Sequence, residues 1–272
     1  DDGEVGWESP WGRGRPGWHI ECSAMATALL GPELDIHCGG VDNIFPHHEA
    51  EIAQSECCTG KKFVRYWLHC AHLMVEGQKM SKSLGNFYTL RDLLQKGYSG
   101  REIRHALSTV NYRLPLNFTF AGLDGARTAL ARIDEWVDRL KAQAQGADAF
   151  GSTKLSLYEE RFFECLDDDL NISGAMGQLF DLIRESNRLM DEGALDAPSA
   201  AQLLKSWQRI NAVLALQRET AVVSPEVLAL LEQRQRARAE KNWAESDRLR
   251  DEIAKLGWIV KDTKEGPKLT PK

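Results

Sequence analysis

Residues 20–75 alternate between helical and strand-like stretches, and this alternation limits the possible folds more than any other feature of the sequence. Apolar spacing, Gly and Pro breaks and runs of β-branched or aromatic residues mark the elements. The expected order is helix, strand, helix and strand, at 20–30, 34–38, the residues after Pro46, and 66–74. Such alternation is typical of a doubly wound α/β sheet. We therefore predict that residues 1–75 hold part of a sheet of this kind.

Beyond Thr89 the pattern changes to helices alone. Apolar residues recur there at the spacing of an amphipathic helix. The predicted helices are 91–95, 99–112, 121–145, 154–166, 175–190, 200–216 and 226–256. The expected linkers are 146–153 and 220–225. The predicted fold class is α/β followed by mostly α.

Composition excludes several classes of protein. The chain has 272 residues and a formal net charge of −6, so it does not bind nucleic acid through bulk positive charge. The last 41 residues hold 11 Lys and Arg against 8 Asp and Glu, which indicates either a local basic face or a solvated helix surface. No apolar run approaches the roughly 18–20 residues that cross a bilayer, and the opening residues lack signal-peptide features. Six scattered cysteines predict a reduced, cytoplasmic protein without membrane contact.

The pentapeptide Lys79-Met80-Ser81-Lys82-Ser83 lies in a glycine-flanked loop between a predicted strand and a predicted helix. Two lysines three positions apart can close on a polyphosphate and neutralise charge that develops as a phosphate–oxygen bond breaks. An ordinary exposed turn is the alternative. The pentapeptide is, however, the second signature of class I aminoacyl-tRNA synthetases, and a specified pentapeptide is rare by chance in a chain of this length.

Cys22, His47 and Glu51 form a candidate metal site. His47 and Glu51 are four residues apart in a helical stretch, so their side chains leave the same face. Cys22 lies in the preceding helix, and two helix starts of an α/β unit can converge at one sheet edge. Thiolate, imidazole and carboxylate suit zinc, which prefers a fourth ligand, and Cys38 is the local candidate for it. A core cysteine beside an exposed His–Glu pair is the alternative.

Six segments together resemble the cysteinyl-tRNA synthetase family. They are GWHIECSAM (17–25), DIHCGGVD (35–42), FPHHEAE (45–51), KMSKSLGN (79–86), DDDLN (167–171) and KNWAESD (241–247). The resemblance covers essentially the whole chain. It implies the second half of a Rossmann-like catalytic domain, a KMSKS loop with a stem-contact fold, a helical bundle and a small α/β anticodon module. The implied bounds are 1–75, 76–128, 129–219 and 220–272.

The chain departs from the family pattern at one motif. The His-x-Gly-His tetrapeptide that follows the first strand of class I synthetases does not occur, and the sequence begins without Met. We therefore expect the chain to be a fragment whose N-terminal half lies elsewhere. We also expect it to be catalytically inactive by itself.

In the family, two Cys, one His and one Glu hold a zinc ion in the amino-acid pocket. Cys22, His47 and Glu51 match three of these ligands, and the resemblance assigns the second Cys to the absent N-terminal half. Trp18 resembles the residue that walls the cysteine pocket. Such a zinc site favours cysteine over serine, because a hydroxyl is a poor zinc ligand. His48 points away from the ligand direction and is interpreted as structural.

The resemblance also implies where ATP binds, with Mg²⁺ as its counter-ion. Glycines allow the backbone to come close to the adenylate. The expected contacts are His37, Gly39, Gly40, Asp42, Lys79, Met80, Ser81, Lys82 and Ser83. Of these, Lys79 and Lys82 are the expected catalytic residues.

Arg238, Trp243, Asp247 and Asp262 match positions that the resembling synthetases use to read a GCA anticodon. Trp243 and Asp247 are expected on one helix face. An indole can stack on an unpaired base, a carboxylate can accept from a base amino group, and an arginine can pair with a phosphate or a guanine edge. The alternative is that Trp243 packs inside the module, as we expect for Trp258.

The function implied is ATP-dependent ligation of L-cysteine to the 3′ end of tRNA(Cys) through cysteinyl-adenylate, by a monomer. One alternative is the ligase that joins cysteine to an amino-sugar in thiol-cofactor biosynthesis, which needs no RNA and so no anticodon-reading tail. A catalytically inactive RNA-binding fragment is the other.

Overall fold

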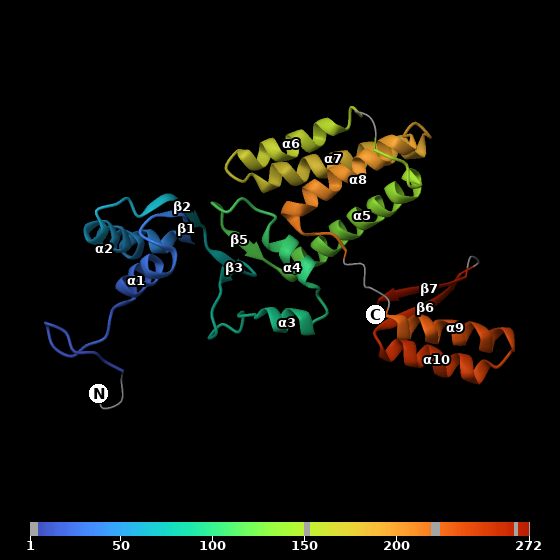
Figure 1. The fold of residues 1–272 in the computed structure, drawn as a ribbon, viewed down its shortest axis with the longest axis horizontal. Coiled ribbons are helices and arrows are strands. Elements are labelled where there is room, and N and C mark those ends of the chain that lie inside the picture. The colour runs from blue at the N-terminus through green and yellow to red at the C-terminus, as the bar shows by residue number, and fades with distance from the viewer. Residues whose placement is uncertain (1–4, 150–152, 219–223, 264–265, 272) are drawn as a thin grey trace. The chain divides into compact units, whose positions relative to one another are not determined.

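The computed structural model describes residues 5–149, 153–218, 224–263 and 266–271. The chain divides into two compact units, Asp1–Gln217 and Arg218–Lys272, whose elements Figure 1 labels. Among the described residues, no helix is both long enough and apolar enough to cross a membrane.

The first unit begins with a small α/β region, as the alternation predicts. Its elements are α1 (Trp18–Leu30), β1 (Leu34–Gly40), the short helical turns η1 (Val41–Asn43) and η2 (Ile44–His48), α2 (Glu49–Thr59) and β2 (Val64–Cys70). Strands β1 and β2 pair in parallel, with Leu34 opposite Val64 and Gly40 opposite Cys70. Parallel neighbours require a crossover connection, which α2 provides. The core of this region is small and contains Leu34, Phe63 and Val64.

The prediction of one strand over 66–74 is wrong. Strand β2 ends at Cys70, and β3 (Leu73–Val75) belongs to a different sheet, with β4 (Gln78–Lys79) and β5 (Leu116–Phe118) on either side. The chain turns away between them, where the Ala71 amide donates to the Tyr112 carbonyl at 2.8 Å. Because β4 and β5 have only two and three residues, they show no periodicity from which to predict them.

Two short helices follow this sheet, α3 (Leu90–Gln95) and α4 (Gly100–Leu107). Each begins with a capping box, Thr89 with Asp92 and Ser99 with Glu102, which satisfies the first free amides. The predicted helix 99–112 is too long, since α4 ends at Leu107. At the next position the Ser108 hydroxyl donates to carbonyls of the last turn, a bond that competes with helix continuation.

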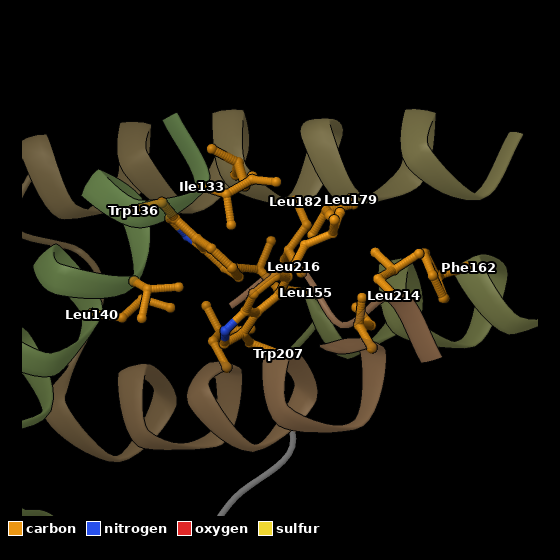
Figure 2. Packing of buried hydrophobic residues seen from close by; sticks show 14 of the residues in the cluster. Ile133, Trp136, Leu140, Leu155, Phe162, Leu179, Leu182, Trp207, Leu214 and Leu216 are labelled. Carbon is orange, nitrogen blue, oxygen red and sulfur yellow. The ribbon is translucent and has the colours of Figure 1, made fainter. Parts of the chain in front are cut away.

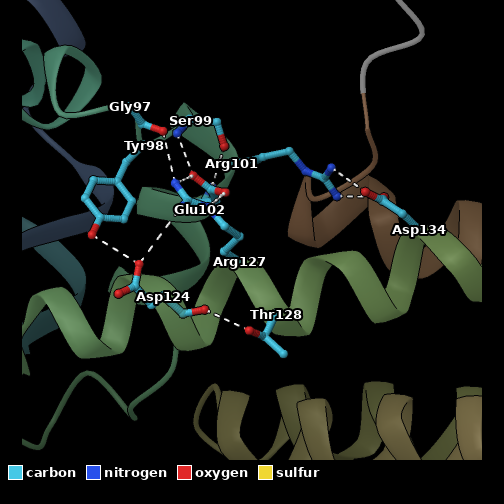
Figure 3. Close-up of polar contacts among 9 residues, drawn as sticks. All are labelled: Gly97, Tyr98, Ser99, Arg101, Glu102, Asp124, Arg127, Thr128 and Asp134. Carbon is cyan, nitrogen blue, oxygen red and sulfur yellow. Dashed lines mark hydrogen bonds and ion pairs between the residues drawn. The ribbon is translucent and has the colours of Figure 1, made fainter. Parts of the chain in front are cut away.

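Helix α5 (Phe120–Ala144) is tied to α4 by ion pairs and hydrogen bonds, shown in Figure 3. The Arg101 guanidinium donates to both Asp134 oxygens at 2.8 Å. Arg127 donates to Glu102 at 2.8 Å. These charge-assisted contacts fix α4 against α5.

The bundle consists of α5, α6 (Ser156–Asp167), α7 (Ile172–Asp191) and α8 (Ala197–Leu214). Figure 2 shows its core, in which the rings of Trp136 and Trp207 pack edge to face with centroids 6.1 Å apart. The Trp136 indole donates to the buried Ser186 hydroxyl at 2.7 Å, so its polar atom is satisfied. This largest apolar cluster of the described residues makes the bundle a rigid support for the regions attached to it.

The second unit is a helical hairpin followed by a strand hairpin. Its elements are α9 (Pro225–Ala239), α10 (Trp243–Lys255), β6 (Trp258–Thr263) and β7 (Gly266–Pro271). The prediction of one helix over 226–256 is therefore wrong. Lys241 has a left-handed φ of 60°, and the Asn242 side chain caps α10 by accepting from the Glu245 amide. Trp258 packs in the core as expected.

Candidate functional site

The predicted metal ligands come together where α1, η2 and α2 meet. Cys22 lies on α1, His47 is in η2, and Glu51 is in the first turn of α2. One ligand atom from each lies within 4.8 Å of the other two. Helix α1 packs directly on α2, which brings a cysteine and a His–Glu pair distant in sequence to one point.

Glu51 is the most unusual member of this cluster, because its carboxylate is completely buried. Neither oxygen has a hydrogen-bond partner among the described residues. The nearest nitrogens are His47 Nε2, 2.6 Å from Oε1, and His37 Nε2, 3.6 Å from Oε2. Burial raises the pKa of Glu51. An anionic carboxylate in such a place requires a positive partner.

The neighbouring groups do not supply that positive charge. Burial, and then His19, lower the pKa of His47, so its imidazole is neutral and able to donate a lone pair. Burial, and then Glu51, raise the pKa of the Cys22 thiol. A thiol, a neutral imidazole and an orphaned carboxylate match the donor set of a divalent cation, with zinc favoured by the sulfur ligand. Cys38 is exposed on β1 and joins no potential ligand group in the described part of the chain.

A histidine network that the sequence analysis largely missed surrounds the cluster. His48 is buried, and its Nδ1 lies 2.8 Å from Nε2 of His69 on β2. Burial, and then His37, lower the pKa of His48 to about 4. His37, His48 and Glu51 form a second group of potential ligands, and the structural role we expect for His48 stays a prediction. Only the repeated His in the segments 35–42 and 45–51 signals this network in the sequence.

Trp18 lies against the cluster, and its place in the amino-acid pocket stays a prediction. Its indole stacks on the His47 imidazole at 4.0 Å between centroids, and the residue is 58% exposed. His19, which the sequence analysis did not single out, places Nδ1 2.6 Å from Nδ1 of His47. One face of the indole thus contacts a potential ligand, while much of the residue remains open.

The glycine segment at the end of β1 has a structural reason for its composition. A Cβ atom on Gly39 would lie 2.5 Å from His48 Cε1, and one on Gly40 would collide with the Asp42 carboxylate. His37 stacks on the Trp67 indole at 4.6 Å. The predicted adenylate contacts of this segment stay predictions, but a larger residue at position 39 would displace the buried imidazole.

The Asn86 side chain bridges the two ends of the lysine loop. Asn86 accepts from the Ser81 amide at 2.8 Å and donates to the Lys79 carbonyl at 3.1 Å. The Lys79 and Lys82 side chains are exposed, and Lys82 lies 5.5 Å from the centroid of the Phe87 ring. Met80 points to an apolar cavity of about 270 Å³. The two ammonium groups are thus free of carboxylate partners among the described residues and lie in a loop whose two ends are fastened.

The lysine loop and the glycine segment follow strands of different sheets. Gly39 and Gly40 end β1, which pairs with β2, whereas Lys79 ends β4 in the three-stranded sheet. Met80, Ser81, Lys82 and Ser83 follow β4, and the hydroxyls of the two serines lie 2.7 Å apart. The structure gives the predicted ATP contacts as two separate groups.

The predicted anticodon residues gather on the second unit. Arg238 lies with its guanidinium 5.8 Å from the Trp243 ring centroid and donates to Asp262 at 3.1 Å. Trp243 is 58% exposed, so the alternative that it packs inside the module is wrong. Asp247 is exposed and lies 3.4 Å from Arg250. Arg234, which no sequence motif marked, is buried and donates to both oxygens of Asp262.

Three family models match the chain. The class I (C) tRNA synthetase catalytic domain matches residues 1–128, a DALR domain matches 161–216, and the cysteinyl-tRNA ligase anticodon binding domain matches 220–266. Among curated proteins, the cysteine–tRNA ligase of Chlamydia felis is 48% identical over 98% of this chain, and that of Chlamydia pneumoniae is 49% identical over 99% of it. The matches cover 57% and 58% of those proteins, so the chain spans little more than half the length of these relatives.

Solved structures with a similar fold include two synthetases. The LeuRS of Agrobacterium radiobacter K84, solved in complex with tRNA, superposes on this chain with a TM-score of 0.52 at 17% identity. The match covers 67% of this chain and 26% of that one. Methionyl-tRNA synthetase of Mycobacterium tuberculosis has a TM-score of 0.51 at 18% identity, over 66% of this chain and 41% of that one. At such identities these structures support the fold alone.

Proposed function

The chain belongs to the cysteine–tRNA ligase family of class I aminoacyl-tRNA synthetases, and we propose that it is part of an enzyme that joins L-cysteine to tRNA(Cys) with ATP. The observation that carries the proposal is the cluster of Cys22, His47 and Glu51 beneath an open indole. Its buried carboxylate makes no hydrogen bond of good geometry among the described residues, so it has no evident use in packing. A cation there would also explain why a thiol substrate is selected.

The amino-acid pocket is formed, in this proposal, by the cluster and Trp18. A zinc ion held by Cys22, His47 and Glu51 would supply a Lewis acid that takes the substrate sulfur as thiolate. We expect a fourth donor from the part of the longer relatives that this chain does not match. Trp18 orients the side chain of His47 through their stacked rings and excludes water from that face.

Lys79 and Lys82 act, in this proposal, on the polyphosphate of ATP. Their exposed ammonium groups are close enough in the chain to neutralise charge that develops on the leaving pyrophosphate as the carboxylate of cysteine attacks the α-phosphate. Asn86 keeps the loop ends in place. In this proposal the Gly39–Asp42 segment contacts the adenylate. Mg²⁺ accompanies ATP as counter-ion. No covalent intermediate with the protein is needed, because positioning and electrostatics suffice.

The second unit recognises the tRNA in the same proposal. Its exposed indole and the charged groups beside it suit an unpaired anticodon better than a duplex. We further propose that the protein acts as a monomer in the cytoplasm, where tRNA and ATP are available. The amino-sugar ligase has no use for this unit, which disfavours that alternative.

Cysteine-dependent exchange of pyrophosphate into ATP tests the proposal. The assay uses the longer protein that contains this chain, with serine as the matched control amino acid. We expect exchange with cysteine and almost none with serine, followed by charging when tRNA(Cys) is added. Transfer to an amino-sugar but not to tRNA would favour the other ligase, and RNA binding without exchange would indicate a non-catalytic protein.

A further inference from the structure

Arg234 is a buried cation on α9 whose only described polar partner is Asp262 on β6. It is 2% exposed and is one of the largest fully buried side chains among the described residues. Its Nη1 and Nη2 donate to Oδ1 and Oδ2 of Asp262 at 2.9 and 3.0 Å. Its Nε is buried and has no hydrogen-bond partner in the described part of the chain. Arg234 therefore directs its hydrogen bonding toward one carboxylate, in a planar fork.

A series of contacts leads from this fork to the surface. The Asp262 side chain is 44% exposed, and its Oδ2 also accepts from Arg238 at 3.1 Å. The Arg238 guanidinium lies 5.8 Å from the centroid of the Trp243 ring, and Trp243 is 58% exposed. Arg234 and Arg238 are one helical turn apart on α9, so both reach the same carboxylate. The buried arginine thus determines where the exposed acid stands beside the exposed indole.

The fork also determines which hydrogen bonds Asp262 can make. The hydrogen bond from Arg234 lowers the pKa of Asp262, and the charges of Arg234, Arg238 and Arg250 lower it further. Burial acts in the opposite direction and does not outweigh them. The carboxylate is therefore ionised and can only accept. Of its roughly four lone-pair positions, the three arginine bonds occupy three. The remaining position, on Oδ1, suits an amino group and repels a carbonyl.

Building on the proposed function, we propose that Arg234 is a positioning residue for anticodon reading. It holds Asp262 as an acceptor of fixed orientation beside Trp243, and so makes the second unit select a base that carries an amino group on its edge. Without the fork, Asp262 can rotate, and the unit would still attract RNA but would no longer distinguish an amino group from a carbonyl.

The experiment measures binding of the 272-residue chain to four RNA hairpins. One carries the triplet GCA, in which every base has an exocyclic amino group. The other three replace a single base by one without that amino group: inosine for G, uracil for C, or inosine for A. For the unchanged chain, we expect at least one replacement to weaken binding about 5- to 150-fold.

The selectivity ratio is the dissociation constant of the replaced hairpin divided by that of the GCA hairpin. Arg234→Lys keeps the charge but cannot form the fork, so we expect this ratio to fall to within about three-fold of one. Arg236→Lys is the matched control, because Arg236 is on the same helix but exposed and paired with Glu232. It should keep the full ratio. Melting temperatures of both variants, and of Arg234→Met, show whether the unit remains folded.

Three results would overturn the proposal. The first is a full ratio in Arg234→Lys, and the second is an equal loss of affinity for all four hairpins. The third is melting of both Arg234 variants below the assay temperature, which would assign the fork to folding alone. Equal binding of all four hairpins by the unchanged chain, with no effect of Trp243→Ala, would instead overturn the proposed anticodon reading on which the Arg234 proposal rests.

Discussion

The candidate metal site and the proposed anticodon surface each contain a carboxylate, but the two carboxylates have opposite environments. Glu51 is completely buried, and the nearest nitrogens among the described residues belong to His47 and His37, whose pKa values burial lowers. Asp262 is partly exposed and is held by two arginines. The first arrangement is unfavourable until a cation arrives, whereas the second is complete within the protein. In the proposed function, the first site receives a cation and the second presents a fixed surface to RNA, and this difference between the two carboxylates can be tested.

The two sites also lie in different compact units, so their functions should be separable. Substitutions in the first unit should change activation of the amino acid without changing RNA binding. Substitutions on the second unit should do the reverse.

Lys82→Ala should give the largest effect. In the longer protein we expect cysteine-dependent pyrophosphate exchange to fall about 10²- to 10³-fold, as when one transition-state donor is removed, with little change in the KM for ATP. Hairpin RNA binding should be unchanged. Lys62→Ala, at an exposed lysine outside the loop, is the control. A normal turnover with a greatly raised KM would show that Lys82 serves ground-state binding instead.

Glu51→Gln should change stability in opposite directions without and with zinc. Without metal the variant should melt higher than the unchanged chain, because a neutral amide costs less to bury than an unpaired carboxylate. With zinc at 100 times its dissociation constant, the unchanged chain should gain about 2.7 kcal/mol and the variant much less. Thermal melts with zinc or with chelator measure both effects.

Glu49→Gln is the matched control for this prediction, because Glu49 is exposed two residues away on the same helix. Its melts should follow those of the unchanged chain. A lower melting temperature for metal-free Glu51→Gln would show that the carboxylate stabilises the fold by itself, and the contrast with Asp262 would fail.

Asp262→Asn makes the same change from acid to amide and should destabilise the second unit. It leaves the buried charge of Arg234 without a counter-charge, which costs about 3–5 kcal/mol in a fully buried pair. We expect about 2–3 kcal/mol here because Asp262 is 44% exposed. Urea unfolding measures the change, with Asp247→Asn as control at an exposed ion pair.

The difference in unfolding free energy between the unchanged chain and Asp262→Asn should depend on pH with a definite sign. The pKa of Asp262 is held below its ordinary value of 3.8 by the Arg234 hydrogen bond above all. A carboxyl group whose pKa is lowered by folding stabilises the folded protein when the pH is above its ordinary pKa. This stabilisation disappears as the pH falls through the pKa that the group has in the folded protein. The difference between the unchanged chain and Asp262→Asn should therefore be constant down to about pH 4 and shrink below it. A difference that grows in acid would contradict the ion pair.

Trp243→Ala should cost about 1–3 kcal/mol of tRNA binding if the indole stacks on a base, and should leave pyrophosphate exchange intact. The contrast is Trp258→Ala, which removes a core residue and should unfold the second unit. Circular dichroism distinguishes the two. Loss of both exchange and folding in Trp243→Ala would make this indole structural.

Most helices were predictable because their apolar spacing is repeated over several turns. The predicted ends of strands and helices are wrong where a single hydrogen bond, which the apolar spacing does not indicate, ends the element. Ala71 leaves the predicted strand to donate to Tyr112, and Asn242 starts a new helix within a continuous periodic stretch. Strands β4 and β5 were missed because they are defined by their pairing with β3 rather than by a pattern of their own.

The sequence by itself determined the alternating region, the helical remainder and the residue types of both sites, because helical spacing and short motifs are local properties. Only the tertiary structure decided that Glu51 is buried next to His47, that His19 and His69 join the cluster, and that Arg234 holds Asp262. The physical reason is that burial and pairing depend on which elements pack together. An arginine on a polar helix looks the same in sequence whether it faces solvent, as Arg236 does, or a carboxylate in the core, as Arg234 does.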